Sequence, residues 1–131
     1  MAVVRPLSDE EAGAEARAVF DDIRARRQTD YVNNFWRALA HDPALLRATW
    51  ERVQQVMAPG ALDPLVKELI YIAVSAANGC DYCVHSHTAA AKARGMSPAQ
   101  HGELLSVIAL AAQTNALATA LSVPVDDRFR A

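Results

Sequence analysis

The sequence of 131 residues has few of the features that build β-sheets. Only 6% of its residues are aromatic, and no segment alternates polar and apolar residues for long enough to predict a strand. Glycine occurs only five times, whereas alanine is abundant, and this favours closely packed helices. Because 52% of the residues are hydrophobic, a chain of this length can bury a real core. We therefore predict an all-α fold with a single domain over residues 1–131.

An excess of one charge is also absent, which excludes several classes of partner. The net charge is −2 and the pI is near 6.0, so no electrostatic feature favours binding to nucleic acid. No glycine-rich loop follows a predicted strand, so the sequence predicts no nucleotide or other cofactor. The first eleven residues, MAVVRPLSDEE, lack the apolar core of a signal peptide, and we expect a cytoplasmic location.

The longest uncharged stretch, residues 104–125, is long enough to cross a bilayer. Gln113, Thr114 and Asn115 interrupt it, however, and we expect no membrane partner. Burial in a core or between subunits explains the stretch better. So much apolar helix surface in a small chain predicts a homo-oligomer.

Local start and stop signals divide the chain into about six helices. The Ser8–Glu11 segment has the pattern of a capping box, whereas Asp42 and Asp63 each precede a proline suited to a first helical position. Gly79 is suited to a helix stop because it tolerates positive φ. The predicted helices cover residues 9–28, a short segment around Phe35, Trp36 and Leu39, residues 43–58, 65–78, 81–94 and 98–121.

The apolar positions of these segments predict what is buried. Trp36 and Trp50 recur at helical spacing with other apolar residues and are interpreted as core. The helix over 65–78 is apolar nearly all round and should be buried. The first helix carries one apolar stripe, formed by Ala12, Ala16, Val19, Phe20 and Ile23.

The chemistry is concentrated around the only two cysteines, Cys80 and Cys83. On one helix these thiols and His87 occupy positions i, i+3 and i+7, so they share a face. Cys83 and His87 are one turn apart, close enough for imidazole to take the thiol proton. His85 points elsewhere, about 200° around the helix from Cys83. Glu68 lies on the preceding helix, and an antiparallel hairpin would bring it back towards the thiols.

The pattern Glu68-x11-Cys80-x2-Cys83-x3-His87 resembles the core of the alkylhydroperoxidase D-like proteins, in the carboxymuconolactone decarboxylase superfamily. The resemblance covers about residues 33–126, including the AHDPALL and LSVPVDD segments. It implies a helical bundle in which Cys83 attacks the peroxide, Cys80 resolves the product, and Glu68 and His87 relay protons. It also implies assembly as a trimer or hexamer. Decarboxylase members typically lack the paired cysteines, so lactone decarboxylation is not implied.

The residues support the same reaction. A thiol attacks peroxide as thiolate, which the start of a helix and a nearby imidazole both favour. The resulting sulfenic acid on Cys83 could condense with Cys80 to a disulfide, which an electron donor must reopen. We predict a thiol-dependent oxidoreductase, with an organic hydroperoxide as the small-molecule substrate and a thiol or dithiol protein as electron donor.

Three alternatives remain open at this stage. The same dithiol could reduce disulfides rather than peroxides, or it could merely sense oxidation in a non-catalytic oligomer. Two cysteines, a histidine and a carboxylate are also a plausible zinc set. Tyr82 is a candidate accessory residue, because well-characterised peroxidases of the family often carry histidine directly before the second cysteine. Tyrosine can donate a hydrogen bond there but is a poor base at neutral pH.

Overall fold

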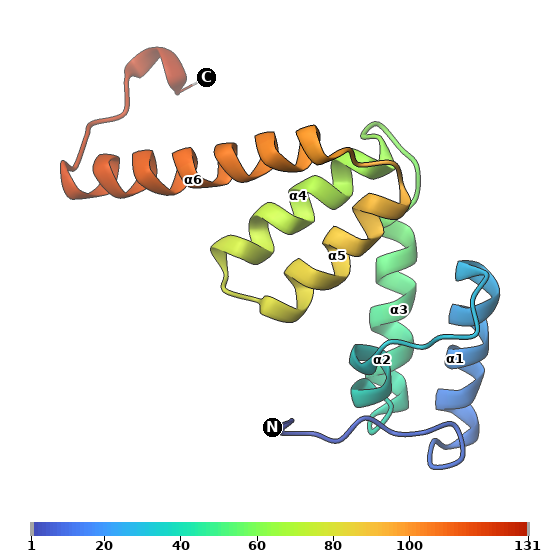
Figure 1. Ribbon diagram of the computed structural model, residues 1–131. Coiled ribbons are helices and arrows are strands. Elements are labelled where there is room, and N and C mark those ends of the chain that lie inside the picture. The colour runs from blue at the N-terminus through green and yellow to red at the C-terminus, as the bar shows by residue number, and fades with distance from the viewer. Residues whose placement is uncertain (1, 131) are drawn as a thin grey trace. The chain divides into compact units, whose positions relative to one another are not determined.

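The computed structural model describes residues 2–130 and is helical wherever it is regular (Figure 1). Six α-helices and one short 3-10 helix make up the described chain, which confirms the all-α prediction. Two compact units divide the chain, Met1–Ala58 and Pro59–Ala131. We describe each unit by itself. That residues 1–131 form one folding domain stays a prediction.

The N-terminal unit contains α1 (Ala14–Arg27), α2 (Asn34–Leu39) and α3 (Pro43–Met57). The two tryptophans meet edge to face in its core, with ring centroids 5.3 Å apart. Both are almost fully buried, as predicted. All five residues of the predicted α1 stripe are buried as well, and they pack around the tryptophans with Val32, Ala40 and Leu46.

The predicted start of the first helix was wrong by five residues. The capping box does form: the Ser8 N–H donates to Glu11 Oε2 (2.9 Å), and the Glu11 N–H donates to Ser8 Oγ (3.3 Å). These bonds close a separate turn, however, and α1 begins only at Ala14. Hydrogen bonds from Arg5 and from the Ser8 backbone lower the pKa of Glu11 to about 2.

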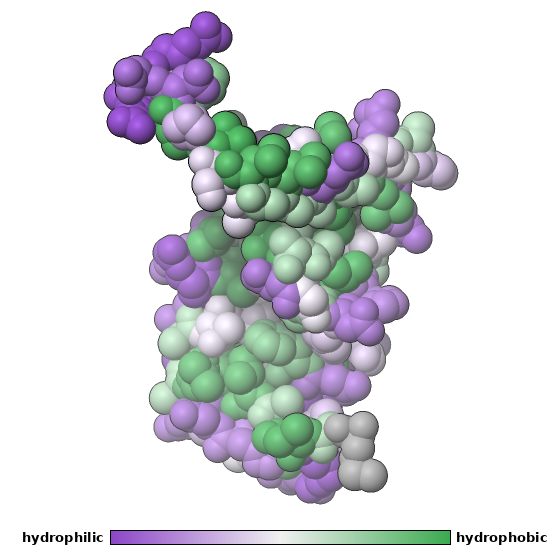
Figure 2. Space-filling view, turned by 90° about the vertical axis from the view of Figure 1, so that its left-hand side faces the viewer, coloured by the Kyte–Doolittle hydropathy of each residue, from purple (hydrophilic) through white to green (hydrophobic). Residues whose placement is uncertain are grey.

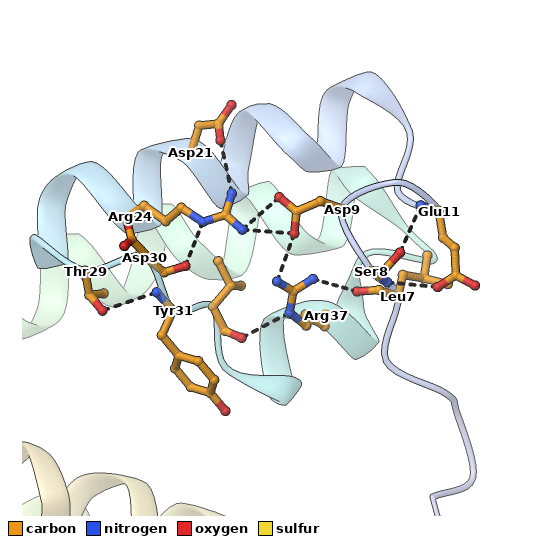
Figure 3. A network of polar contacts seen from close by, with 11 residues as sticks. Leu7, Ser8, Asp9, Glu11, Asp21, Arg24, Thr29, Asp30, Tyr31 and Arg37 are labelled. Carbon is orange, nitrogen blue, oxygen red and sulfur yellow. Dashed lines mark hydrogen bonds and ion pairs between the residues drawn. The ribbon is translucent and has the colours of Figure 1, made fainter.

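Contacts distant in sequence fix this turn beside α1 (Figure 3). The Asp9 carboxylate bridges Arg24 (2.7 Å) and Arg37 (2.9 Å), and Arg37 also donates to the carbonyl oxygens of Leu7 and Val32. Burial would raise the pKa of Asp9, but the hydrogen bonds from Arg37 and Arg24 outweigh it and lower that pKa. A turn before α1 therefore replaces its predicted first turns.

The C-terminal unit contains α4 (Pro64–Ala77), α5 (Asp81–Ala93), α6 (Pro98–Ala120) and the 3-10 helix η1 (Asp127–Phe129). In this unit α4 and α5 form an antiparallel hairpin, and α6 packs against α4 (Figure 1). Each predicted start signal operates. Asp63 Oδ1 accepts from the Leu65 N–H (2.8 Å), and Ser97 forms a full capping box with Gln100. Gly79 adopts the expected positive φ, +69°.

Burial in the C-terminal unit differs from the prediction. Its small core consists of Ile72, Ala91 and Met96, with partly buried leucines and Ile108 around it. We expected α4 to be buried all round, but Val66, Ile70 and Val74 are exposed, and α6 buries none of its residues. Of the two alternatives given for residues 104–125, packing against this chain's own core accounts only for the partly buried Leu104 and Ile108. Sequence alone could not reveal this, because an apolar side chain is buried only where another element covers it.

The exposed apolar side chains of α6 form a green surface next to the purple C-terminal segment in Figure 2. By length and composition, α6 is the one helix of the described chain that could cross a membrane. This carries little weight, since a single helix that passes such a test also occurs in proteins outside membranes. Burial of the α6 surface between subunits stays a prediction.

Candidate active site

The two cysteines lie at the start of α5 and form a disulfide with each other. Cys80 is the N-cap residue, and its Sγ accepts from the Cys83 N–H (3.3 Å). Gly79 turns the chain just before this point, and the Cys80 N–H donates back to the Ser75 carbonyl oxygen (2.9 Å). Both cysteines are half-buried. In the reduced protein the positive end of the α5 dipole would favour a thiolate.

Glu68 and His87 join the two helices of the hairpin. His87 Nδ1 lies 2.7 Å from Glu68 Oε2, and the carboxylate is almost fully buried. Arg94, at the C-terminal end of α5, donates from Nε to the other carboxylate oxygen at 3.4 Å. A buried carboxylate needs such partners, because removing it from water without them would be costly. With Nδ1 engaged, Nε2 is the nitrogen of His87 that remains for proton transfer.

Tyr71 covers one face of the same imidazole. Its ring is stacked on that of His87, with centroids 3.5 Å apart and an interplanar angle of 17°. Tyr71 lies three residues after Glu68, so one face of α4 presents both contacts to His87. Sequence reasoning missed Tyr71 and Arg94. Their spacings, i+3 from Glu68 and i+7 from His87, place each on the same helix face as a predicted site residue and could have indicated them.

The structure leaves the other polar residues of α5 outside this pair. His85 is exposed and lies with Nδ1 2.9 Å from the Asp81 carbonyl oxygen of its own helix, which agrees with the predicted direction. Tyr82 is 44% exposed between the cysteines.

No group of three or more histidine, cysteine, aspartate or glutamate side chains that could hold a metal ion occurs within residues 2–130. The predicted zinc set would need Glu68 and His87 beside both thiols, whereas these two side chains bond to each other and the thiols form a disulfide. The arrangement supports thiol chemistry better than a structural zinc site.

The N-terminal unit has a surface hollow of about 460 Å³ between α1 and α3. Asp22, Arg26, Arg47 and Trp50 contribute to its lining, and the Trp50 indole N–H donates to Asp22 (2.7 Å). None of the predicted site residues lines this hollow.

Comparison with known proteins agrees with these features. The sequence profile of the carboxymuconolactone decarboxylase family matches residues 43–126. The alkyl hydroperoxide reductase AhpD of Solibacter usitatus (strain Ellin6076) is 38% identical over 84 residues, which are 64% of this chain and 42% of the relative. The chain thus spans less than half the length of that relative.

A solved structure is similar along the whole chain. The crystal structure of the alkylhydroperoxidase AhpD core from Rhodospirillum rubrum ATCC 11170 has 63% sequence identity and a TM-score of 0.97. The match covers 100% of this chain and 98% of that one. The chain therefore belongs to the carboxymuconolactone decarboxylase family, as an all-α, alkylhydroperoxidase D-like member with its Cys-x-x-Cys pair at the start of α5.

Proposed function

We propose that this protein is a thiol-dependent alkylhydroperoxidase that reduces organic hydroperoxides through Cys80 and Cys83. The observation that carries the proposal is a dithiol at a helix start whose second cysteine lies one turn before the Glu68–His87 pair. A helix end and an imidazole held by a carboxylate both favour the thiolate that peroxide chemistry requires. Similarity to proteins described as alkylhydroperoxidases supports the same substrate class.

The reaction proceeds in three steps: attack on the peroxide, formation of the disulfide and reduction of that disulfide. The Cys83 thiolate attacks the terminal peroxide oxygen, the O–O bond breaks, and the alcohol leaves after taking up a proton, so that Cys83 becomes a sulfenic acid. The Cys80 thiolate then attacks Cys83 Sγ and displaces hydroxide, which is released as water after protonation. A thiol or dithiol donor protein returns two electrons and two protons by thiol–disulfide exchange.

His87 transfers the protons in these steps, and Glu68 supports it. His87 Nε2 accepts the Cys83 proton and later returns one to the leaving oxygen. Glu68 fixes the imidazole through Nδ1 and stabilises the imidazolium form. Tyr82 is an accessory hydrogen-bond donor between the two cysteines, and no metal or cofactor takes part.

The exposed apolar surface of α6 supports assembly of this chain with copies of itself, as a trimer or hexamer. We also place the protein in the cytoplasm, because each turnover needs a reducing partner and the compartment keeps thiols reduced. Light scattering coupled to size-exclusion chromatography measures the assembly. A monomer at micromolar concentration would refute the oligomer.

The intact mass of reduced protein, measured before and after one equivalent of cumene hydroperoxide, tests the function. Wild type should lose two hydrogens within seconds. Cys80→Ser should instead gain one oxygen, and Cys83→Ser should not react. Thiols that stay reduced in wild type would refute the peroxidase proposal. Turnover of a small disulfide would then favour a disulfide reductase, whereas one oxidation without turnover by any thiol donor would favour a redox sensor.

A further inference from the structure

The imidazole of His87 is contacted from two directions by one turn of α4. Glu68 holds an edge of the ring through Nδ1 at 2.7 Å, and Tyr71 holds a face at a centroid distance of 3.5 Å. A single hydrogen bond lets a ring rock about the line that joins the two bonded atoms. A parallel stack removes that freedom, because rocking would open the contact on one side.

The two contacts also differ in what they do to the charge on His87. Glu68 is almost fully buried and attracts the imidazolium directly. The Tyr71 face carries the negative part of the ring quadrupole, so it attracts an imidazolium more than a neutral imidazole. Four titratable or charged side chains surround this ring in the hairpin. Glu68 and Tyr71 of α4 contact His87 directly, Arg94 of α5 contacts Glu68, and Cys83 lies one turn before His87 on α5.

Arg94 competes with His87 for the Glu68 carboxylate, which gives the stack with Tyr71 a role of its own. Its guanidinium shares the Glu68 carboxylate with His87, and it stays charged at any pH at which proteins are folded. The attraction of Glu68 for an imidazolium is therefore divided between two cations. The stack with Tyr71 favours the imidazolium without involving Glu68, and it therefore compensates for this division.

We propose that Tyr71 is a positioning residue for the thiol chemistry: its stacked ring fixes the plane of His87 and stabilises the imidazolium that forms when Nε2 takes the Cys83 proton. The inference rests on the proposed function of His87 as the base for Cys83. The aromatic face performs this role and the phenol oxygen does not. Phenylalanine should therefore replace Tyr71, whereas leucine, of similar bulk but without a π face, should not.

The test measures the alkylation rate of Cys83 against pH in fully reduced protein that also carries Cys80→Ser, so that one thiol reacts. Tyr71→Leu should slow alkylation at pH 7 by about two- to fivefold and shift the midpoint of the profile to higher pH. Tyr71→Phe should restore the parent profile. Ile70→Ala, an exposed position next along the same helix, is the matched control and should change neither the rate nor the midpoint.

Nitrogen NMR of the His87 ring, identified by the signals lost in His87→Asn, gives a second readout independent of peroxide chemistry. In Tyr71→Leu the ring-nitrogen shifts should move away from the parent values and towards those of a free imidazole. Parent-like profiles and shifts in Tyr71→Leu would overturn the inference, as would a Tyr71→Phe variant as impaired as Tyr71→Leu. If wild type failed to reduce hydroperoxide, the proposed function would fail while these readouts still reported on Tyr71.

Discussion

Replacing Glu68 with glutamine tests the central contact of the site. The substitution keeps the size of the side chain and removes its charge. Glu68 is 4% exposed and makes a 2.7 Å bond to His87, so its carboxylate is largely shielded from solvent and from salt. A hydrogen bond between charged groups contributes about 1.5–3 kcal/mol net. We take the lower half of that range, because Arg94 shares the carboxylate and the His87 side chain is 21% exposed.

A loss of about 1.5–2 kcal/mol from the imidazolium corresponds to a decrease of roughly 10- to 30-fold in the Cys83 thiolate that His87 supports near neutral pH. The assay is the rate of Cys83 alkylation by iodoacetamide in reduced protein at pH 7. The decrease should persist from 0.05 to 0.5 M salt, since a buried pair is screened only weakly. Peroxide reduction, followed by the mass of the protein, should slow by a similar factor.

Glu103→Gln is the matched control, because Glu103 is an exposed acid of the same unit on α6. It should leave the alkylation rate unchanged. The thermal midpoint of each variant, measured by circular dichroism, shows whether the fold is intact. A folded Glu68→Gln variant that alkylates at the wild-type rate would refute the role of the Glu68–His87 pair in activating Cys83.

Three further predictions concern the scaffold. Asp9→Asn should lower the free energy of unfolding of the protein by about 1–2 kcal/mol in urea titrations at pH 7, because it weakens the bridge between Arg24 and Arg37, although partial exposure limits the loss. The folded state lowers the pKa of Asp9, so the stabilisation by this carboxylate is complete above its unfolded pKa near 4 and is lost as pH falls through its folded pKa. The difference in free energy of unfolding between wild type and Asp9→Asn should therefore shrink towards pH 2. A difference that stays constant with pH would contradict this. Leu46→Ala removes a fully buried side chain from the tryptophan cluster and should cost about 2–5 kcal/mol in the same titration, whereas Leu45→Ala, at a half-exposed neighbouring position, should cost much less. Gly79→Ala should destabilise the α4–α5 hairpin by about 1 kcal/mol through backbone strain alone, because φ is +69° and nothing lies within 4 Å of the added Cβ; unchanged urea stability would show that the turn relaxes without cost.

Local signals predicted most helix boundaries because they act within a few residues of the chain. Asp42, Asp63 and Ser97 each accept from the backbone of the first turn that follows, so their effect depends on sequence neighbours only. The start of α1 differs because contacts with residues distant in sequence determine it. Asp9 bonds to Arg24 and Arg37, 15 and 28 residues away, and no local rule reveals those partners.

Burial of the apolar helices could not be predicted for a related reason. The sequence indicates that α4 and α6 carry more apolar surface than a solvated helix needs, but it does not name what covers that surface. In the C-terminal unit, α5 and α6 cover part of the apolar surface of α4, and the rest of that surface stays exposed. Whether an apolar helix face is buried depends on the elements that pack against it, and a single chain supplies only some of those elements.

The candidate site was accessible from sequence because it lies within one hairpin, residues 68–94. The helical period placed the two cysteines and His87 on one face, and the short turn at Gly79 fixed the direction in which Glu68 returns. The period says which residues share a face, however, and not which ring lies flat against which. The Tyr71–His87 stack depends on how far apart the two helices pack and at what rotation, and side chains across the whole hairpin set both quantities. The candidate reacting groups can therefore be named from their spacing in the sequence, whereas the orientation of the proposed base depends on packing between the two helices.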